Sequence, residues 1–143
     1  MSLHTYEDVV ARIERIIDVK GTDFVYEIHQ DSPIICFYAL NGKPDCIVGH
    51  LLVELGVPVE VLEYEGTRDL NAWDHDFASD TISNHWAALE SQYALAFTDE
   101  ARTYLRALQS NQDNGRTWGW SNMDAKDMTE RLRRARTKAD KAF

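Results

Sequence analysis

The sequence predicts an α+β fold in which a small antiparallel β-hairpin or sheet packs with about five α-helices. Apolar side chains recur every three to four positions in residues 5–20, as on one face of an amphipathic helix. Residues 24–28 and 34–40 are instead rich in β-branched and aromatic side chains, which is typical of strands. With 143 residues, 44% of them hydrophobic, the chain can bury a core without disulfides or structural metal, and we expect a single globular domain over residues 1–143.

The first predicted helix covers residues 5–20. Thr5 stands where a residue caps a helix N-terminus, with Asp8 three residues on as in a capping box, and Gly21 suits the left-handed conformation after a helix. The side chains expected to face the core are Tyr6, Val9, Val10, Ile13, Ile16 and Ile17.

The two predicted strands, residues 24–28 and 34–40, are expected to pair as an antiparallel hairpin. The dipeptide Asn41-Gly42 that follows is a strong turn signal. Because a helical pattern begins soon after it, at residue 46, this turn is expected to lead out of the sheet and into a helix.

The helix at residues 46–55 is apolar on most sides and is predicted to be the buried central element. Asp45 is its expected N-cap, while Gly56 and Pro58 are expected to end it. Residues 59–64 fit either a helical turn or an edge strand.

Three further helices are predicted at residues 84–97, 98–112 and 123–142, with Thr98 and Ser121 as N-caps of the last two. The last helix has only a thin apolar stripe, so we expect it to lie at the periphery of the domain. The stripe consists of Met128, Leu132, Ala135, Ala139 and Phe143.

Charge is divided unevenly along the chain. Residues 1–110 hold 7 Lys and Arg against 19 Asp and Glu, whereas residues 111–143 hold 8 against 5. An acidic body repels phosphate, so nucleic acid is not an expected partner. The apolar run at residues 47–53 is far shorter than the roughly 20 residues that span a bilayer, the N-terminus has no apolar signal segment, and Cys36 and Cys46 fit a reducing compartment. We therefore expect a cytoplasmic protein with no membrane partner.

Two stretches of opposite charge are candidate contact surfaces. Residues 54–80 contain eight acids and one base, Arg68, and are expected to include a long loop from residue 66. A basic run in the last helix is commonly its solvated face, but it also suits an acidic partner, an acidic surface of a second copy in a homodimer, or nucleic acid. The run holds Arg131, Arg133, Arg134, Arg136, Lys138 and Lys141 against Asp140.

The cysteines and histidines offer one candidate site. Cys46 and His50 lie four residues apart on one helical face, Cys36 lies ten residues earlier, and His29 or His85 could be a fourth ligand. The close cysteine pair of a zinc finger is missing, and buried cysteines often act as small hydrophobic residues. A thiolate–imidazole nucleophile also needs an orienting residue and an oxyanion hole that nothing in the sequence marks. We predict no cofactor, no metal ligands and no catalytic residues.

The segment 73–76, Trp-Asp-His-Asp, with Asp80 and His85 downstream, is the other place where oxygen and nitrogen ligands gather. Their spacing does not fit a calcium-binding loop, because Ala78 and Ser79 occupy positions that need a ligand and the turn glycine. A solvated acidic loop is the preferred interpretation.

Trp118 and Trp120 flank Gly119 in a glycine-containing connection. Two tryptophans in such a segment can anchor it on the core or form a contact hot spot. We expect at least one of the two rings to be buried, and both residues are candidates for an interaction surface.

Two blocks of sequence resemble small uncharacterised proteins encoded by mycobacteriophages and other actinobacterial phages. The first comprises residues 36–38 (Cys-Phe-Tyr), 41–49 (Asn-Gly-Lys-Pro-Asp-Cys-Ile-Val-Gly), Leu52 and 55–57 (Leu-Gly-Val). The second, residues 109–118, is similar to a Q-x-x-Q-D-x-G-x-x-W stretch in those proteins. The blocks cover about a quarter of the chain, and their glycines, proline and turn residues are typical of a fold nucleus.

The resemblance implies a non-virion accessory protein that acts in the host cytoplasm by contacting a host bacterial protein, without catalysis. Two other functions stay open from the residues themselves. One is a metal-dependent or thiol enzyme centred on Cys36, Cys46 and His50, and the other is an acidic mimic of nucleic acid that occupies a DNA-binding host protein.

Overall fold

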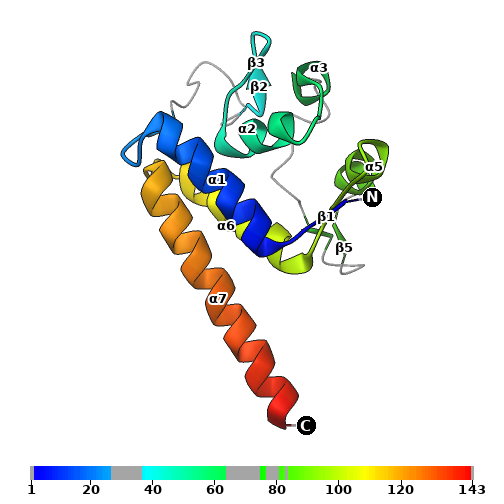
Figure 1. Cartoon of the computed structure of the whole chain (residues 1–143), viewed down its shortest axis with the longest axis vertical. Coiled ribbons are helices and arrows are strands. Elements are labelled where there is room, and N and C mark those ends of the chain that lie inside the picture. The colour runs from blue at the N-terminus through cyan, green and yellow to red at the C-terminus, as the bar shows by residue number, and fades with distance from the viewer. Residues whose placement is uncertain (1, 27–36, 64–74, 77–80, 83, 143) are drawn as a thin grey trace.

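The computed structural model describes residues 2–26, 37–63, 75–76, 81–82 and 84–142 of the chain. Helices form most of the described part, with short two-stranded pieces beside them, so the predicted α+β class is confirmed (Figure 1). The elements in chain order are β1 (Ser2–His4), α1 (Tyr6–Lys20), β2 (Ala39–Leu40), β3 (Lys43–Pro44), α2 (Ile47–Glu54), α3 (Val59–Glu63), β4 (His75–Asp76), β5 (Thr81–Ile82), α5 (Asn84–Gln92), β6 (Leu95–Phe97), α6 (Asp99–Asp113) and α7 (Trp118–Ala142).

Helix α1 forms as its pattern predicts. The Thr5 hydroxyl accepts the Asp8 backbone N–H at 3.2 Å, and Gly21 follows the helix with a φ of 102°. The Asp8 carboxylate does not turn back onto the helix start, because it is held by His4 and Arg12 instead. The buried face consists of Tyr6, Val9, Val10, Ile13 and Ile17.

Asn41 and Gly42 make a hairpin turn rather than an exit from the sheet. Both have positive φ, 55° and 75°, and β2 pairs antiparallel with β3 across them. The prediction that this turn leads directly from the sheet into a helix was wrong, because residues 43 and 44 first pair with β2. The predicted pairing of residues 24–28 with 34–40 lies partly outside the described residues; within them, Val25 forms an antiparallel bridge with Thr117.

Helix α2 is the buried central element, as predicted, with five of its eight residues buried. Its N-cap is Cys46, not Asp45: the Cys46 sulfur accepts the Gly49 N–H at 3.4 Å. The prediction that Asp45 caps the helix was wrong, because its carboxylate accepts a hydrogen bond from the hydroxyl of buried Tyr26. The Ile47 N–H is taken by the side-chain oxygen of Gln112, which reaches over from α6 at 2.9 Å.

The segment after α2 resolves the open alternative at residues 59–64, since α3 is a short helix. The long loop expected from residue 66 lies mostly outside the described residues, which include only the β4–β5 pair there. The helix predicted over residues 84–97 was wrong in its last part. Helix α5 stops at Gln92, Ala94 adopts a φ of 53°, and β6 pairs in parallel with β1 at the other end of the chain.

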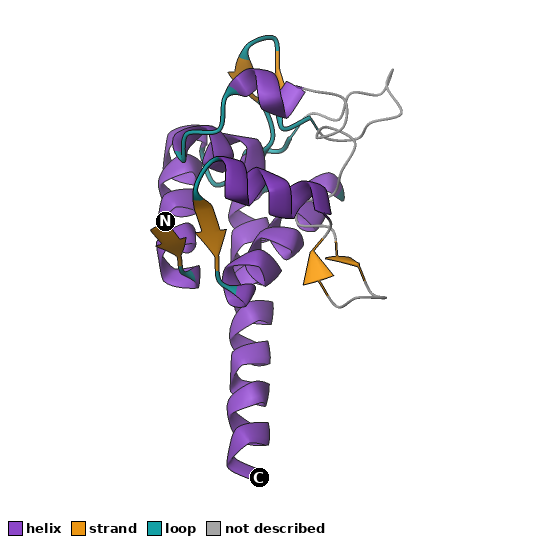
Figure 2. Cartoon of the chain, turned by 90° about the vertical axis from the view of Figure 1, so that its right-hand side faces the viewer, coloured by secondary structure: helices purple, strands orange, loops and turns teal. Residues whose placement is uncertain are grey.

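Helix α6 runs from its predicted cap, Thr98, whose hydroxyl accepts the Ala101 N–H at 3.2 Å. Helix α7 begins at Trp118, so the predicted start near residue 123 and the predicted Ser121 cap were wrong; Ser121 is buried inside the helix. The first half of α7 packs along α6 and α1, while its second half stands clear of the other described elements in both views (Figures 1 and 2). In the described part of the chain, no helix is both long and apolar enough to cross a membrane.

Gly49 marks a close approach that only glycine permits. A Cβ atom built there would lie 1.8 Å from the backbone oxygen of Tyr38, which belongs to the chain leading into the β2–β3 hairpin. Helix α2 and that segment therefore pack backbone against backbone.

We expect Gly49→Ala to lower the free energy of unfolding by more than about 2 kcal/mol, because the methyl group forces two rigid backbones apart. Gly115→Ala is the control: Gly115 has a φ of 82° and open space around it, so it should lose only the left-handed conformational preference, about 1 kcal/mol. Urea unfolding of the two variants measures both values. A loss at Gly49 no larger than that at Gly115 would contradict the packing argument.

Candidate interaction surface

Helix α7 changes its surroundings halfway along its length. Ala125 and Thr129 are buried against the body, whereas Met128 and Leu132 are 39% and 43% exposed. Every residue from 134 to 141 is exposed. The helix therefore has a docked half and a projecting half, with the change near residue 130.

An apolar stripe begins at the end of the docked half and runs along the projecting half. Met128, Leu132, Ala135 and Ala139 follow one another at intervals of four, three and four residues, which places them on one face of the helix. We call these four residues the α7 stripe. The sequence predicts the same stripe as the inner face of a peripheral helix, but the structure leaves it exposed. The fifth predicted member, Phe143, lies outside the described residues.

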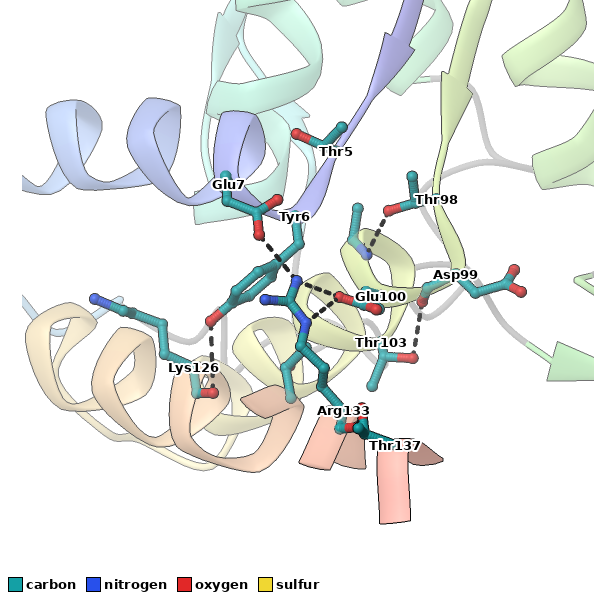
Figure 3. A network of polar contacts seen from close by, with 12 residues as sticks. Thr5, Tyr6, Glu7, Thr98, Asp99, Glu100, Thr103, Lys126, Arg133 and Thr137 are labelled. Carbon is teal, nitrogen blue, oxygen red and sulfur yellow. Dashed lines mark hydrogen bonds and ion pairs between the residues drawn. The ribbon is translucent and has the colours of Figure 1, made fainter. Parts of the chain in front are cut away.

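Arg133 fixes the point at which α7 leaves the body (Figure 3). Its guanidinium donates to Glu7 on α1 at 2.9 Å and to Glu100 on α6, with Nε 2.8 Å from the carboxylate. The same guanidinium lies over the Tyr6 ring, 5.1 Å from its centroid. The Tyr6 hydroxyl in turn donates to the Lys126 carbonyl, about two turns earlier in α7, at 3.5 Å. One cation thus ties three helices together.

The charge states of this cluster are strongly favoured. Hydrogen bonds from Arg133 to Glu100 and Glu7 raise the pKa of the guanidinium above its ordinary range. The pKa of Glu7 is lowered, first by its own backbone N–H and then by Arg133. Burial raises the pKa of Tyr6 to about 12. The Glu7 carboxylate, the Arg133 cation and the neutral Tyr6 phenol therefore keep their charge states over the whole physiological pH range.

The other cations predicted as contact residues differ in whether they have an ion-pair partner. Arg131 pairs with Asp127 one turn earlier in α7, at the helix surface. Among the residues that the structure describes, Arg134, Arg136 and Lys138 have no carboxylate partner. Arg133 thus anchors α7 to the body, whereas Arg134, Arg136 and Lys138 are exposed.

The two tryptophans separate into an anchor and a surface residue. Trp118 is fully buried, as expected for at least one of the pair, and packs edge-on against Phe24 and His50. It therefore presents no ring to a partner. Trp120 is 44% exposed and is covered on one side by the Arg116 guanidinium, 4.8 Å from the ring. Of the two, only Trp120 remains a candidate for surface contact.

The Cys46–His50 pair is engaged in the helix itself. Cys46 is fully buried with its sulfur on the Gly49 N–H, and the His50 Nδ1–H donates to the Cys46 carbonyl at 2.9 Å. Burial lowers the pKa of His50. Cys36, His29 and the side chain of His85 lie outside the described residues. Within the described ranges, no three His, Cys, Asp or Glu side chains gather as metal ligands would.

The described part of the acidic stretch makes internal contacts. Glu54 accepts from Arg12 at 3.3 Å and lies 3.8 Å from Arg15, and Glu63 accepts the Gly42 N–H at 2.8 Å. The acidic candidate at residues 73–80 lies outside the description apart from the backbone of His75 and Asp76.

The role of Arg133 is not visible in the sequence, where the residue is one member of a basic run. The acceptors Glu7 and Glu100 are 126 and 33 residues away in the chain, and no local pattern links them to Arg133. The heptad-like spacing of the α7 stripe can be read from the sequence. The sequence does not show that the described body leaves the stripe exposed.

No protein-family model, no curated protein and no solved structure matches this chain.

Arg133→Ala is expected to loosen the projecting half of α7, because it removes the contacts to α1 and α6 at the place where the helix leaves the body. Amide hydrogen exchange at residues 130–141 should become at least about ten-fold faster. Arg134→Ala is the matched control on the same helix, one residue along and without a carboxylate partner among the described residues. Equal exchange in both variants would show that Arg133 does not anchor the helix.

We expect His50 to lower the free energy of unfolding in mild acid. Burial places the pKa of folded His50 below its ordinary value of 6.5, so between these two values the unfolded state binds more protons. Stability from this residue is then complete above pH 6.5 and is lost as the pH falls toward the folded pKa. Between about pH 7.5 and 5.5, wild type should lose more unfolding free energy than His50→Gln in urea titrations. Parallel losses would contradict the shift.

Proposed function

We propose that this protein is a binding module that acts by protein–protein contact, without catalysis, and that the projecting half of α7 is its contact surface. The observation that carries the proposal is the exposed α7 stripe, on a helix that extends away from its own body, beside cations that have no carboxylate partner among the described residues. Apolar side chains surrounded by charged ones on an exposed helix face are typical of sites that a second helix or groove covers.

The docked half of α7 supports this function by holding the surface in place. Tyr104 donates to Asn122 at 2.6 Å, and Asn122 and Lys126 both donate to Glu14 on α1, at 3.0 and 3.2 Å. Arg133 adds the last anchor before the helix leaves the body. A surface that is already ordered loses less conformational entropy when it binds, which favours affinity.

The biological setting that we propose is the cytoplasm of a bacterial host infected by an actinobacterial phage, with a host protein as the partner. This part rests on the resemblance carried by residues 36–57 and 109–118. The charge of the projecting half then suggests a partner whose contact surface is acidic.

A tagged chain tests the proposal. With the tag at the N-terminus, far from the projecting half, the chain should capture a stoichiometric protein from a mycobacterial lysate, identified by mass spectrometry. Leu132→Glu should abolish the capture, because it places a charge in the α7 stripe. Met123→Glu is the matched control: Met123 is 70% exposed on a different face of the same helix and should leave capture unchanged.

Two results would refute the proposed function. One is capture of the same protein, in the same amount, by wild type and Leu132→Glu. The other is the absence of any captured protein together with turnover of small molecules by the purified chain.

A further inference from the structure

The residues beside the α7 stripe are all basic on the projecting half. When two helices pair through a stripe with alternating four- and three-residue spacing, the flanking positions lie next to the partner helix. Here those positions are Arg131 and Lys138 on one side and Arg136 on the other. Residue 129, the remaining flanking position near the junction, is a threonine buried against the body. The stripe therefore has no acidic flank on its exposed length.

These flanks disfavour a second copy of the chain as the occupant. A parallel pair would bring Arg131 of one helix beside Arg136 of the other, and an antiparallel pair would again oppose cations to cations. Like charges at such positions select against the pairing. Two identical stripes would also set Ala135 and Ala139 near other small side chains, which leaves the space between the helices poorly filled.

The same features fit a different kind of helix. Glutamate or aspartate at the flanking positions of a partner would pair with Arg131, Arg136 and Lys138. Large apolar side chains would fill the room beside Ala135 and Ala139, while Met128 and Leu132 would pack on the rest of its stripe. Nucleic acid would use the cations but would leave the apolar stripe uncovered.

We propose that the α7 stripe binds an amphipathic helix of a different protein, one with acidic residues flanking a stripe of large apolar side chains. This inference rests on the proposed function, because it specifies the chemistry of the partner at the same surface. The inference specifies the charge of the partner helix at its flanking positions and the size of the side chains in its stripe. Both can be tested without knowing which protein is bound in the cell.

The test uses two synthetic peptides, each about three heptads long, with leucine at every stripe position. One carries glutamate at all flanking positions and the other carries lysine. Fluorescence anisotropy with the full chain should show the glutamate peptide binding at least about ten-fold more tightly than the lysine peptide. Its affinity should fall as salt is raised, because the flanking pairs are exposed to solvent.

Variants of the chain separate the two parts of the inference. Leu132→Ser should weaken binding of the glutamate peptide by about ten-fold or more, whereas Met123→Ser, the control on another face, should not. A triple variant with Arg131→Glu, Arg136→Glu and Lys138→Glu should reverse the preference and bind the lysine peptide more tightly. Circular dichroism of each variant should match wild type, because the side chains of Leu132, Met123, Arg136 and Lys138 have no hydrogen-bond or ion-pair partner among the described residues, and the pair that Arg131 makes with Asp127 is exposed and contributes little to stability.

Several outcomes would overturn the inference. No binding of the glutamate peptide, or equal binding of both peptides, would do so. Sedimentation that shows a wild-type dimer abolished by Leu132→Ser would identify a second copy as the occupant. Binding of duplex DNA that survives Leu132→Ser would indicate phosphate recognition. If lysate capture still depends on Leu132 while the glutamate peptide fails, the proposed function stands and only this inference falls.

Discussion

The start of α2 is the contact on which the rest of the molecule depends. This helix is buried on most sides, so its first backbone N–H groups have no water to bind, and each one left unpaired would destabilise the fold by about 1–3 kcal/mol. The sulfur of Cys46 accepts one of these groups locally, and the Gln112 side chain accepts another from 65 residues away. The second bond places the end of α6 against the start of α2. Gly49 brings the opposite side of the helix onto the backbone of Tyr38.

The direction of α7 follows from that junction. The chain turns after α6 through Gly115, with a φ of 82°, and Trp118 then packs against His50 on α2. Gly119 allows the new helix to approach the Thr22 carbonyl, which accepts its N–H at 2.9 Å. Residues 37–57 and 109–118 therefore meet in one place, around α2 and the α6–α7 turn. They build the base from which the second half of α7 projects.

The excess negative charge lies in the body, where residues 1–110 hold 7 Lys and Arg against 19 Asp and Glu, whereas α7 holds 7 Lys and Arg against 4 Asp and Glu. Only one cation of the projecting half, Arg133, is seen reaching the acidic body in the described residues, and it does so with two carboxylates at once. Its neighbours at 134, 136 and 138 are exposed, and the second half of α7 extends beyond the other described elements (Figure 2). Because an α-helix is rigid and rises by about 1.5 Å per residue, the basic second half of α7 is held away from the acidic body.

The sequence by itself determined what depends on neighbours in the chain: the capped helix α1, the cap of α6 at Thr98, the turn at Asn41-Gly42, the buried character of α2 and the face shared by Met128, Leu132, Ala135 and Ala139. Tertiary contacts decided the rest. Cys46 rather than Asp45 caps α2, because the Asp45 carboxylate accepts a hydrogen bond from the Tyr26 hydroxyl. The helix predicted through residue 97 ends earlier, because residues 95–97 pair with β1. Periodicity states which side chains share a face, but only the extent of the body, which ends near residue 130, decides whether anything covers them. That is why a stripe predicted to face inward became the candidate contact surface.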